Sequence, residues 1–131
     1  MIELSKNDGE QMGKLTSDNN IMTTCKVTVN PRFAGELKGA LVQADMSILD
    51  MMSEILARID TKLKTKSLAT LAATSDTKVW TLTVHKKVYR DIRGRCLQNG
   101  FNWPNIVRFE LYEYAKELHA KGHMFNAPSK P

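Results

Sequence analysis

The sequence predicts an α+β domain that is mostly helical and is made of two copies of one strand-helix-helix unit. Shifting residues 26–60 by 55 positions places them, without a gap, on residues 81–115. Both segments show the same order of patterns: a short alternating stretch, an amphipathic helical stretch, a capping turn and a second amphipathic stretch. Because a single short strand leaves its backbone groups unpaired, we expect the two copies to pair with each other around a pseudo-twofold axis.

The 131 residues have room for one compact core and leave the ends of the chain outside it. Residues 1–23 are polar and without sustained periodicity, which predicts a flexible N-terminal arm. Residues 119–131 contain glycine and proline and are expected to form a flexible tail. Between them lies one pseudo-dimeric domain, 24–118, which comprises copy one at 24–63, a linker at 64–78 and copy two at 79–118.

In copy one, apolar residues alternate from Thr24, so the chain begins as a half-exposed strand. Asn30 and Pro31 are typical of a helix start, and Ser47 with Asp50 forms a capping-box pattern that starts a second helix. The residues with helical apolar spacing are Phe33, Leu37, Ala40, Leu41 and Ala44 in the first helix and Met51, Met52, Ile55, Leu56 and Ile59 in the second.

In copy two, Trp80, Leu82 and Val84 alternate with polar residues and predict the second strand. Asn99-Gly100 ends the helix that follows, and Asn102 caps the last one. The expected inward residues are Val88, Ile92 and Cys96 or Leu97, then Ile106, Val107, Leu111, Tyr114 and Ala115. Cys96 and Cys25 occupy non-equivalent positions, so both are interpreted as packing residues in a reducing compartment.

Antiparallel pairing of residues 26–30 with 81–85 would make a two-stranded ribbon packed on four helices. Its inner face would carry Val27, Val29, Leu82 and Val84. Its outer face would carry hydrogen-bonding side chains that the core does not need, namely Lys26, Thr28, Thr81 and Thr83. A two-stranded ribbon fits the major groove of B-DNA, where lysine reaches guanine and threonine contacts base edges or the thymine methyl group.

Charge adds to this interpretation. The formal net charge is +5, and the cations gather in the linker and copy two. They are Lys62, Lys64, Lys66, Lys78, Lys86, Lys87, Arg90, Arg93, Arg95 and Arg108. Such a one-sided positive field is typical of proteins that bind polyanions, but many soluble proteins without such a partner are equally basic.

These segments resemble the ribbon-helix-helix family of DNA-binding proteins over about two thirds of the chain. The resemblance rests on residues 26–31 with the helix after them, on Met46-Ser47, and on their repeats at residues 81–83 and Phe101-Asn102. Two copies fused in one chain are similar to relaxosome accessory proteins of conjugative plasmids and to DNA-binding virulence accessory proteins of T-DNA transfer. The resemblance implies a cytoplasmic monomer that acts as a pseudo-dimer, with double-stranded DNA and a relaxase or other transfer protein as partners.

By the same resemblance, Lys26, Thr28, Thr81 and Thr83 contact bases. The expected phosphate contacts lie at the strand ends and at the starts of the helices. They are Asn30, Ser47, Ile48, His85, Lys86, Lys87, Asn102 and Trp103. Packing on the neighbouring helix is an equal alternative for Trp103. Copy two lacks the strand lysine, which suits an asymmetric or degenerate DNA site better than a perfect palindrome.

Other functional classes find less support. His119 and His123 have a metal-binding spacing, but Gly122 separates them and no further ligand is near, so we expect no metal and no cofactor. The chain has no phosphate loop and no nucleophile with a placed base, which argues against an enzyme. No apolar run approaches the roughly 20 residues that span a bilayer, so no membrane contact is expected. A transcriptional repressor of the same fold, an antitoxin-like or partition-like protein-interaction adaptor, and a structural domain with an inert ribbon remain alternatives.

Overall fold

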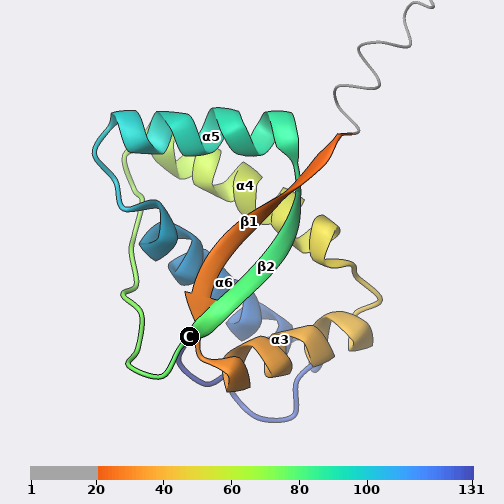
Figure 1. Ribbon diagram of the computed structural model, residues 1–131. Helices are drawn as coiled ribbons and strands as arrows, with labels where there is room; N and C mark the ends of the chain where they lie inside the picture. The colour runs from red at the N-terminus through yellow and green to blue at the C-terminus, as the bar shows by residue number, and fades with distance from the viewer. Residues whose placement is uncertain (1–20) are drawn as a thin grey trace, which may run out of the picture.

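The computed structural model describes residues 21–131 and is α+β, with one two-stranded antiparallel sheet and four helices (Figure 1). The predicted class, mostly helical with an antiparallel pair of strands, is confirmed. The elements follow the chain as β1 (Met22–Val29), α3 (Pro31–Gln43), α4 (Ile48–Thr65), β2 (Lys78–His85), α5 (Lys86–Gln98) and α6 (Trp103–Ala120). None of the described helices is both long and apolar enough to cross a bilayer.

The register of the sheet centres on one residue pair. Lys26 lies opposite Thr81, which is also its counterpart in the 55-residue repeat. The local twofold axis that relates the strands therefore passes through this pair. The expected pairing of residues 26–30 with 81–85 is wrong in register, because residues 26–29 pair with 81–78 and residues 22–26 pair with 85–81. The inner and outer faces are unchanged, since the two registers differ by an even number of residues.

Strand β1 begins at Met22, two residues before the predicted start, so residues 22 and 23 belong to the sheet and not to the predicted arm. Of the rest of that arm, only Ile21 is among the described residues.

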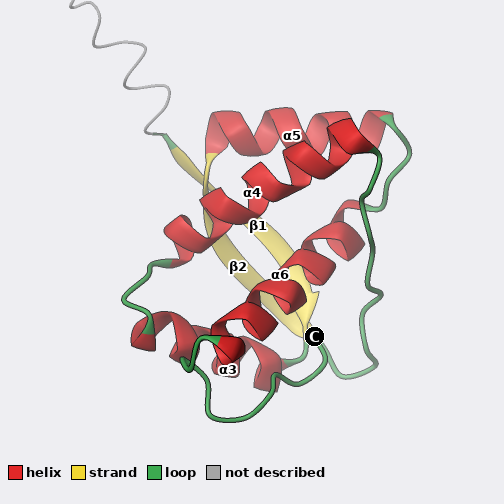
Figure 2. Ribbon diagram, turned by 180° about the vertical axis from the view of Figure 1, so that it is seen from behind, coloured by secondary structure: helices red, strands yellow, loops and turns green. Residues whose placement is uncertain are grey.

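The inner face of the sheet is the centre of the core. Val27, Val29, Leu82 and Val84 are all at most 3% exposed, as their alternation predicts. Helices α4 and α6 lie across this face, as the view from behind shows (Figure 2), and α3 and α5 lie at the two ends of the sheet (Figure 1). Cys25 and Trp80 also belong to the inner face.

The predicted apolar residues of α3, α4 and α6 are buried, except that Ala44, after the end of α3, is only partly so. The prediction for α5 is wrong at Val88, which is 46% exposed. The inward side of α5 carries Tyr89, Ile92 and Cys96, spaced by three and four residues, so Val88 points away from the sheet.

Side-chain caps fix three of the four helix starts. The Asn30 side chain accepts a hydrogen bond from the Arg32 N–H at 2.9 Å. Ser47 and Asp50 form the predicted capping box at the start of α4. The Asn102 side chain accepts from the Asn105 N–H at 3.1 Å. Each cap satisfies a backbone donor that the first helical turn leaves free.

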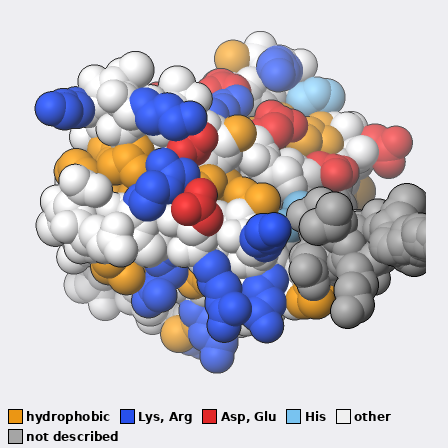
Figure 3. Space-filling view, turned by 90° about the horizontal axis from the view of Figure 1, so that it is seen from above, with side chains coloured by type: hydrophobic (Ala, Val, Ile, Leu, Met, Phe, Trp, Pro, Cys, Tyr) orange, Lys and Arg blue, Asp and Glu red, His pale blue; other side chains and the backbone are white. Residues whose placement is uncertain are grey.

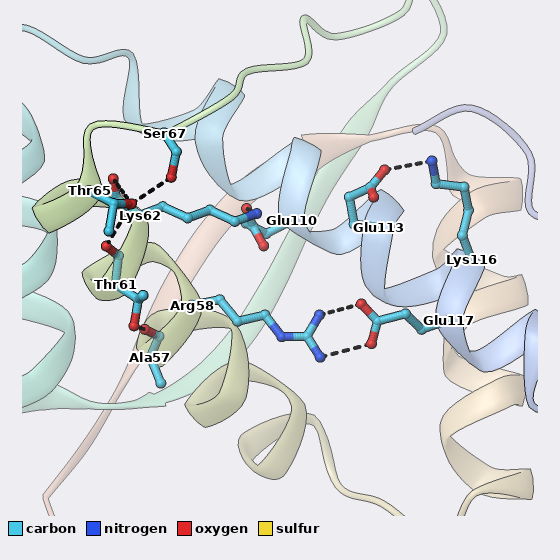
Figure 4. Close-up of polar contacts among 10 residues, drawn as sticks. All are labelled: Ala57, Arg58, Thr61, Lys62, Thr65, Ser67, Glu110, Glu113, Lys116 and Glu117. Carbon is cyan, nitrogen blue, oxygen red and sulfur yellow. Dashed lines mark hydrogen bonds and ion pairs between the residues drawn. The ribbon is translucent and has the colours of Figure 1, made fainter.

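Ion pairs join α4 to α6 behind the sheet (Figure 4). Arg58 donates two hydrogen bonds to Glu117, at 2.7 and 2.8 Å, and the Lys62 Nζ lies 2.6 Å from the buried Glu110 carboxylate. In the repeat, Arg58 corresponds to Glu113 and Lys62 to Glu117. If two identical copies paired, the Arg58–Glu117 contact would become Arg58 against Lys62, or Glu113 against Glu117. The charges therefore favour pairing between unlike copies.

One buried arginine connects distant segments. Arg108 of α6 is 3% exposed. It donates to the Thr28 carbonyl at 2.7 Å, to the Thr28 hydroxyl at 3.0 Å and to the Leu71 carbonyl at 3.1 Å. Asn105 accepts a further hydrogen bond from it at 2.5 Å. Arg108 thus holds the linker against the free edge of β1. The sequence predicted Arg108 to be among the cations of the positive field, but its side chain is buried.

The last residues fold back onto α3. The Ser129 N–H and hydroxyl donate to the Glu36 carboxylate at 2.8 and 2.9 Å. The Asn30 N–H donates to the Pro131 carbonyl at 2.6 Å. Residues 119 and 120 still belong to α6. The segment expected to form a flexible tail is therefore attached at its end to α3 and to the residue after β1, while Phe125 within it is 98% exposed.

Candidate nucleic-acid interface

The outer face of the ribbon is open, since none of the described elements covers it (Figures 1 and 2). The four predicted base-contacting residues all lie on this face, because they share one strand parity. Lys26, Thr81 and Thr83 are exposed, whereas Thr28 is partly buried. Along the face, the cross-strand pairs are Thr24 with Thr83, Lys26 with Thr81, and Thr28 with Val79.

Sequence reasoning missed two residues of this face, Thr24 and Val79. Thr24 stood at the expected strand boundary, and Val79 follows a polar linker and reads as an inward residue. Alternation counted outward from Lys26 and Thr81 would have found both. Val79 is 62% exposed, so it is an apolar side chain presented to solvent near one end of the face, and Met22, at the other end, is 40% exposed.

Lys26 gives the outer face its charge. Neither strand contains Asp or Glu, and Lys26 is the one cation of the strand residues that point outward. Its side chain pairs with no carboxylate among residues 21–131. A lysine that no carboxylate neutralises is available to an external anion or to the acceptor atoms of a base.

Cations on the two sides of the molecule differ in pairing. On α4 and α6, Arg58, Lys62, Lys64 and Lys116 each lie within 4 Å of a carboxylate. Arg95 is held by Asp60 and Asp91, and its hydrogen bond holds the pKa of Asp60 below the usual value. By contrast, four cations of α5 have no described carboxylate within pairing distance. They are Lys86, Lys87, Arg90 and Arg93.

Cationic side chains are numerous on the ribbon side of the molecule. Viewed from above, Lys and Arg side chains gather along the lower edge of the molecule, which is the side of the outer ribbon face, while most Asp and Glu side chains in view lie farther back (Figure 3). Lys86, Lys87 and Arg90 line a shallow hollow with Ile21, where β1 begins. The open face of the ribbon is therefore bordered by positive charge at its α5 end.

The starts of α4 and α6 differ electrostatically. At α4, the capping box places the Asp50 carboxylate beside Ser47. Asp45 lines a surface hollow together with these two residues. Ile48 packs partly into the core, so only its backbone N–H is at the helix start. At α6, the first turn contains no acid, and Pro104 borders a hollow with Lys26, Thr28 and Val79. A phosphate is therefore repelled at the first helix start and not at the second.

Two predicted phosphate contacts have other roles in the structure, and a third, His85, is partly buried. Trp103 is 3% exposed and packs edge-on against Tyr89, with ring centroids 6.0 Å apart, so its side chain is a core residue. The Asn30 side chain caps α3. His85 precedes α5, and its Nδ1 is buried without a hydrogen-bond partner among the described residues.

Cys25 lies beside Trp103 and Tyr89, and burial raises the pKa of its thiol, which keeps it neutral.

Comparisons of the chain with protein-family models, with curated proteins and with solved structures find no match. Within residues 21–131, no three His, Cys, Asp or Glu side chains gather as they would around a metal ion. The open ribbon face and its cationic border are therefore the features from which a function can be inferred.

Proposed function

We propose that this protein binds double-stranded DNA by placing the outer face of the β1–β2 ribbon in the major groove. The observation that carries the proposal is a ribbon face that no element of residues 21–131 covers, with Lys26 at its twofold centre and no carboxylate from those residues paired with it. A two-stranded ribbon has the width that the major groove admits, and Lys and Thr match the donors and acceptors presented there.

The resemblance to tandem ribbon-helix-helix proteins supports the same proposal. The strand-helix-helix order occurs twice, the strands pair antiparallel, and the pairing axis passes through equivalent residues. On this resemblance we place the protein among accessory factors of conjugative plasmid or T-DNA processing, without catalytic activity of its own, with a relaxase or other transfer protein as a further partner. A repressor of the same fold would use the same ribbon face.

We further propose that the protein acts as a monomer containing its own pseudo-dimer. The complementary charges at Arg58 and Glu117 disfavour pairing of like copies. Sedimentation of the free protein is expected to give one monomeric species at all concentrations, with a melting temperature independent of concentration. A strand-swapped dimer as the sole species would contradict this part of the proposal.

The cations at the start of α5 are expected to act on phosphates and not on bases. Lys86→Ala or Lys87→Ala should weaken binding to every duplex alike, and each lost contact should reduce the slope of log K against log salt by about 1. The matched control is Lys121→Ala, an exposed lysine after α6, which should leave the slope unchanged. Binding that does not depend on salt at all would argue against nucleic acid as the partner.

A further inference from the structure

The two halves of the ribbon are related by the fold, but each related pair of outward positions differs either in side chain or in surroundings. Lys26 and Thr81 face each other on the axis and are not alike. One step from the axis, the 55-residue repeat relates Thr24 to Val79, so a hydrogen-bonding side chain in one half corresponds to an apolar one in the other. Val79 is 62% exposed, and no described side chain covers it.

The third related pair, Thr28 and Thr83, is identical in sequence but not in surroundings. The Thr28 hydroxyl accepts a hydrogen bond from Arg108. The counterpart of Arg108 in copy one is Ser53, whose hydroxyl is bonded within its own helix to Leu49. Thr28 is therefore held in one orientation and left with its proton to donate, whereas the structure gives Thr83 no such constraint within the described residues.

The charged residues around the ribbon also differ between the two copies. Copy two carries Lys86 and Arg90 where copy one has Pro31 and Gly35. Copy one instead carries Asp45 and Asp50 at the α4 start, where copy two has Gly100 and Asn105. A duplex that is symmetric in sequence would still meet two different electrostatic surfaces.

We propose that the protein reads a non-palindromic duplex in a single orientation, with Val79 contacting a thymine methyl group in one half-site while Thr24 meets a polar base edge in the other. This inference rests on the proposed DNA binding. An exposed apolar side chain at a base-facing ribbon position has one apolar partner in the major groove, the C5 methyl of thymine. Val79 is thus the specificity-determining residue that sets one half-site apart.

The test begins with a 20-bp duplex selected by the full chain from a randomised library. Two palindromic derivatives, each repeating one half-site, are titrated beside it. We expect both palindromes to bind about tenfold or more weakly than the selected site, because several base pairs in one half are then wrong. A selected site that is itself palindromic, or a palindrome that binds equally well, would overturn the inference while leaving DNA binding intact.

The second arm isolates the methyl group. Each thymine of the selected site is replaced in turn by deoxyuridine, which lacks only the C5 methyl, and each duplex is titrated with wild type, Val79→Ser and, as control, Thr24→Ser. One deoxyuridine is expected to lower the affinity of wild type by about threefold and to leave that of Val79→Ser unchanged, because serine has no methyl group to contact thymine. Equal sensitivity of both proteins at every thymine would overturn the role of Val79. If no duplex is bound better than random DNA in either arm, the proposed function itself fails.

Discussion

Val29→Lys is expected to unfold the domain, whereas the same change at Val79 should leave it folded. Val29 is 1% exposed on the inner face, so a lysine there would bury a charge without a partner. The expected loss is more than about 4 kcal/mol, a large part of the stability of a domain of this size. Val79 points outward, and its lysine would remain in water.

The two variants make a matched comparison, since both changes add the same side chain at the same end of the ribbon but on opposite faces. Thermal unfolding followed by circular dichroism should show no transition for Val29→Lys and a nearly unchanged midpoint for Val79→Lys. A folded Val29→Lys would mean that the assigned inner face is incorrect. Val79→Lys should also bind random duplex more tightly, because it adds a cation to the proposed DNA surface.

Arg108→Ala is expected to destabilise the protein by about 2 to 4 kcal/mol. The change leaves the Thr28 and Leu71 carbonyls and the Asn105 side chain without a charged donor in a buried site. Arg93→Ala is the matched control, because this arginine is exposed, and it should change stability by less than about 0.5 kcal/mol.

Urea unfolding measures both variants, and native-state hydrogen exchange locates the effect. For Arg108→Ala, protection should fall most at Leu71, whose N–H is bonded to the Asn105 carbonyl, because the linker loses its attachment to β1. Equal stabilities of Arg108→Ala and Arg93→Ala would show that Arg108 is not a structural residue.

Local patterns and the repeat predicted most of the fold. Alternation at Val27 and Val29 identified the inner face, and the repeat identified the second strand as its partner. The register was wrong, because residues 81–85 pair with residues 26–22 and not with 26–30. The caps at Ser47 and Asn102 were predictable for the same reason, since a capping residue and its partner are three positions apart.

Contacts between distant residues were not predictable in this way. Arg108 lies 80 positions from Thr28, and in sequence it resembles any exposed helical arginine. For Trp103 the sequence left a phosphate contact and packing on the neighbouring helix as equal alternatives, because nothing local places Tyr89 beside it. The packing of Ser129 on Glu36 spans 93 positions and has no periodic signal. The sequence thus predicted the two strands and the residues of their outer face, whereas tertiary packing decides which of the neighbouring arginine and aromatic side chains are exposed.

The most direct test of DNA reading by the ribbon is a paired titration of Lys26→Ala on the selected duplex and on random duplex. Lysine at the twofold centre can donate to guanine O6 or N7, an interaction worth about 1 to 3 kcal/mol of discrimination. Lys86→Ala serves as the control that should weaken both duplexes alike. Lys26→Ala, with its fold verified by circular dichroism, is expected to lose at least about fivefold more affinity for the selected duplex than for random DNA. Equal losses on the two duplexes would contradict sequence reading by the ribbon face and would favour the protein-interaction adaptor.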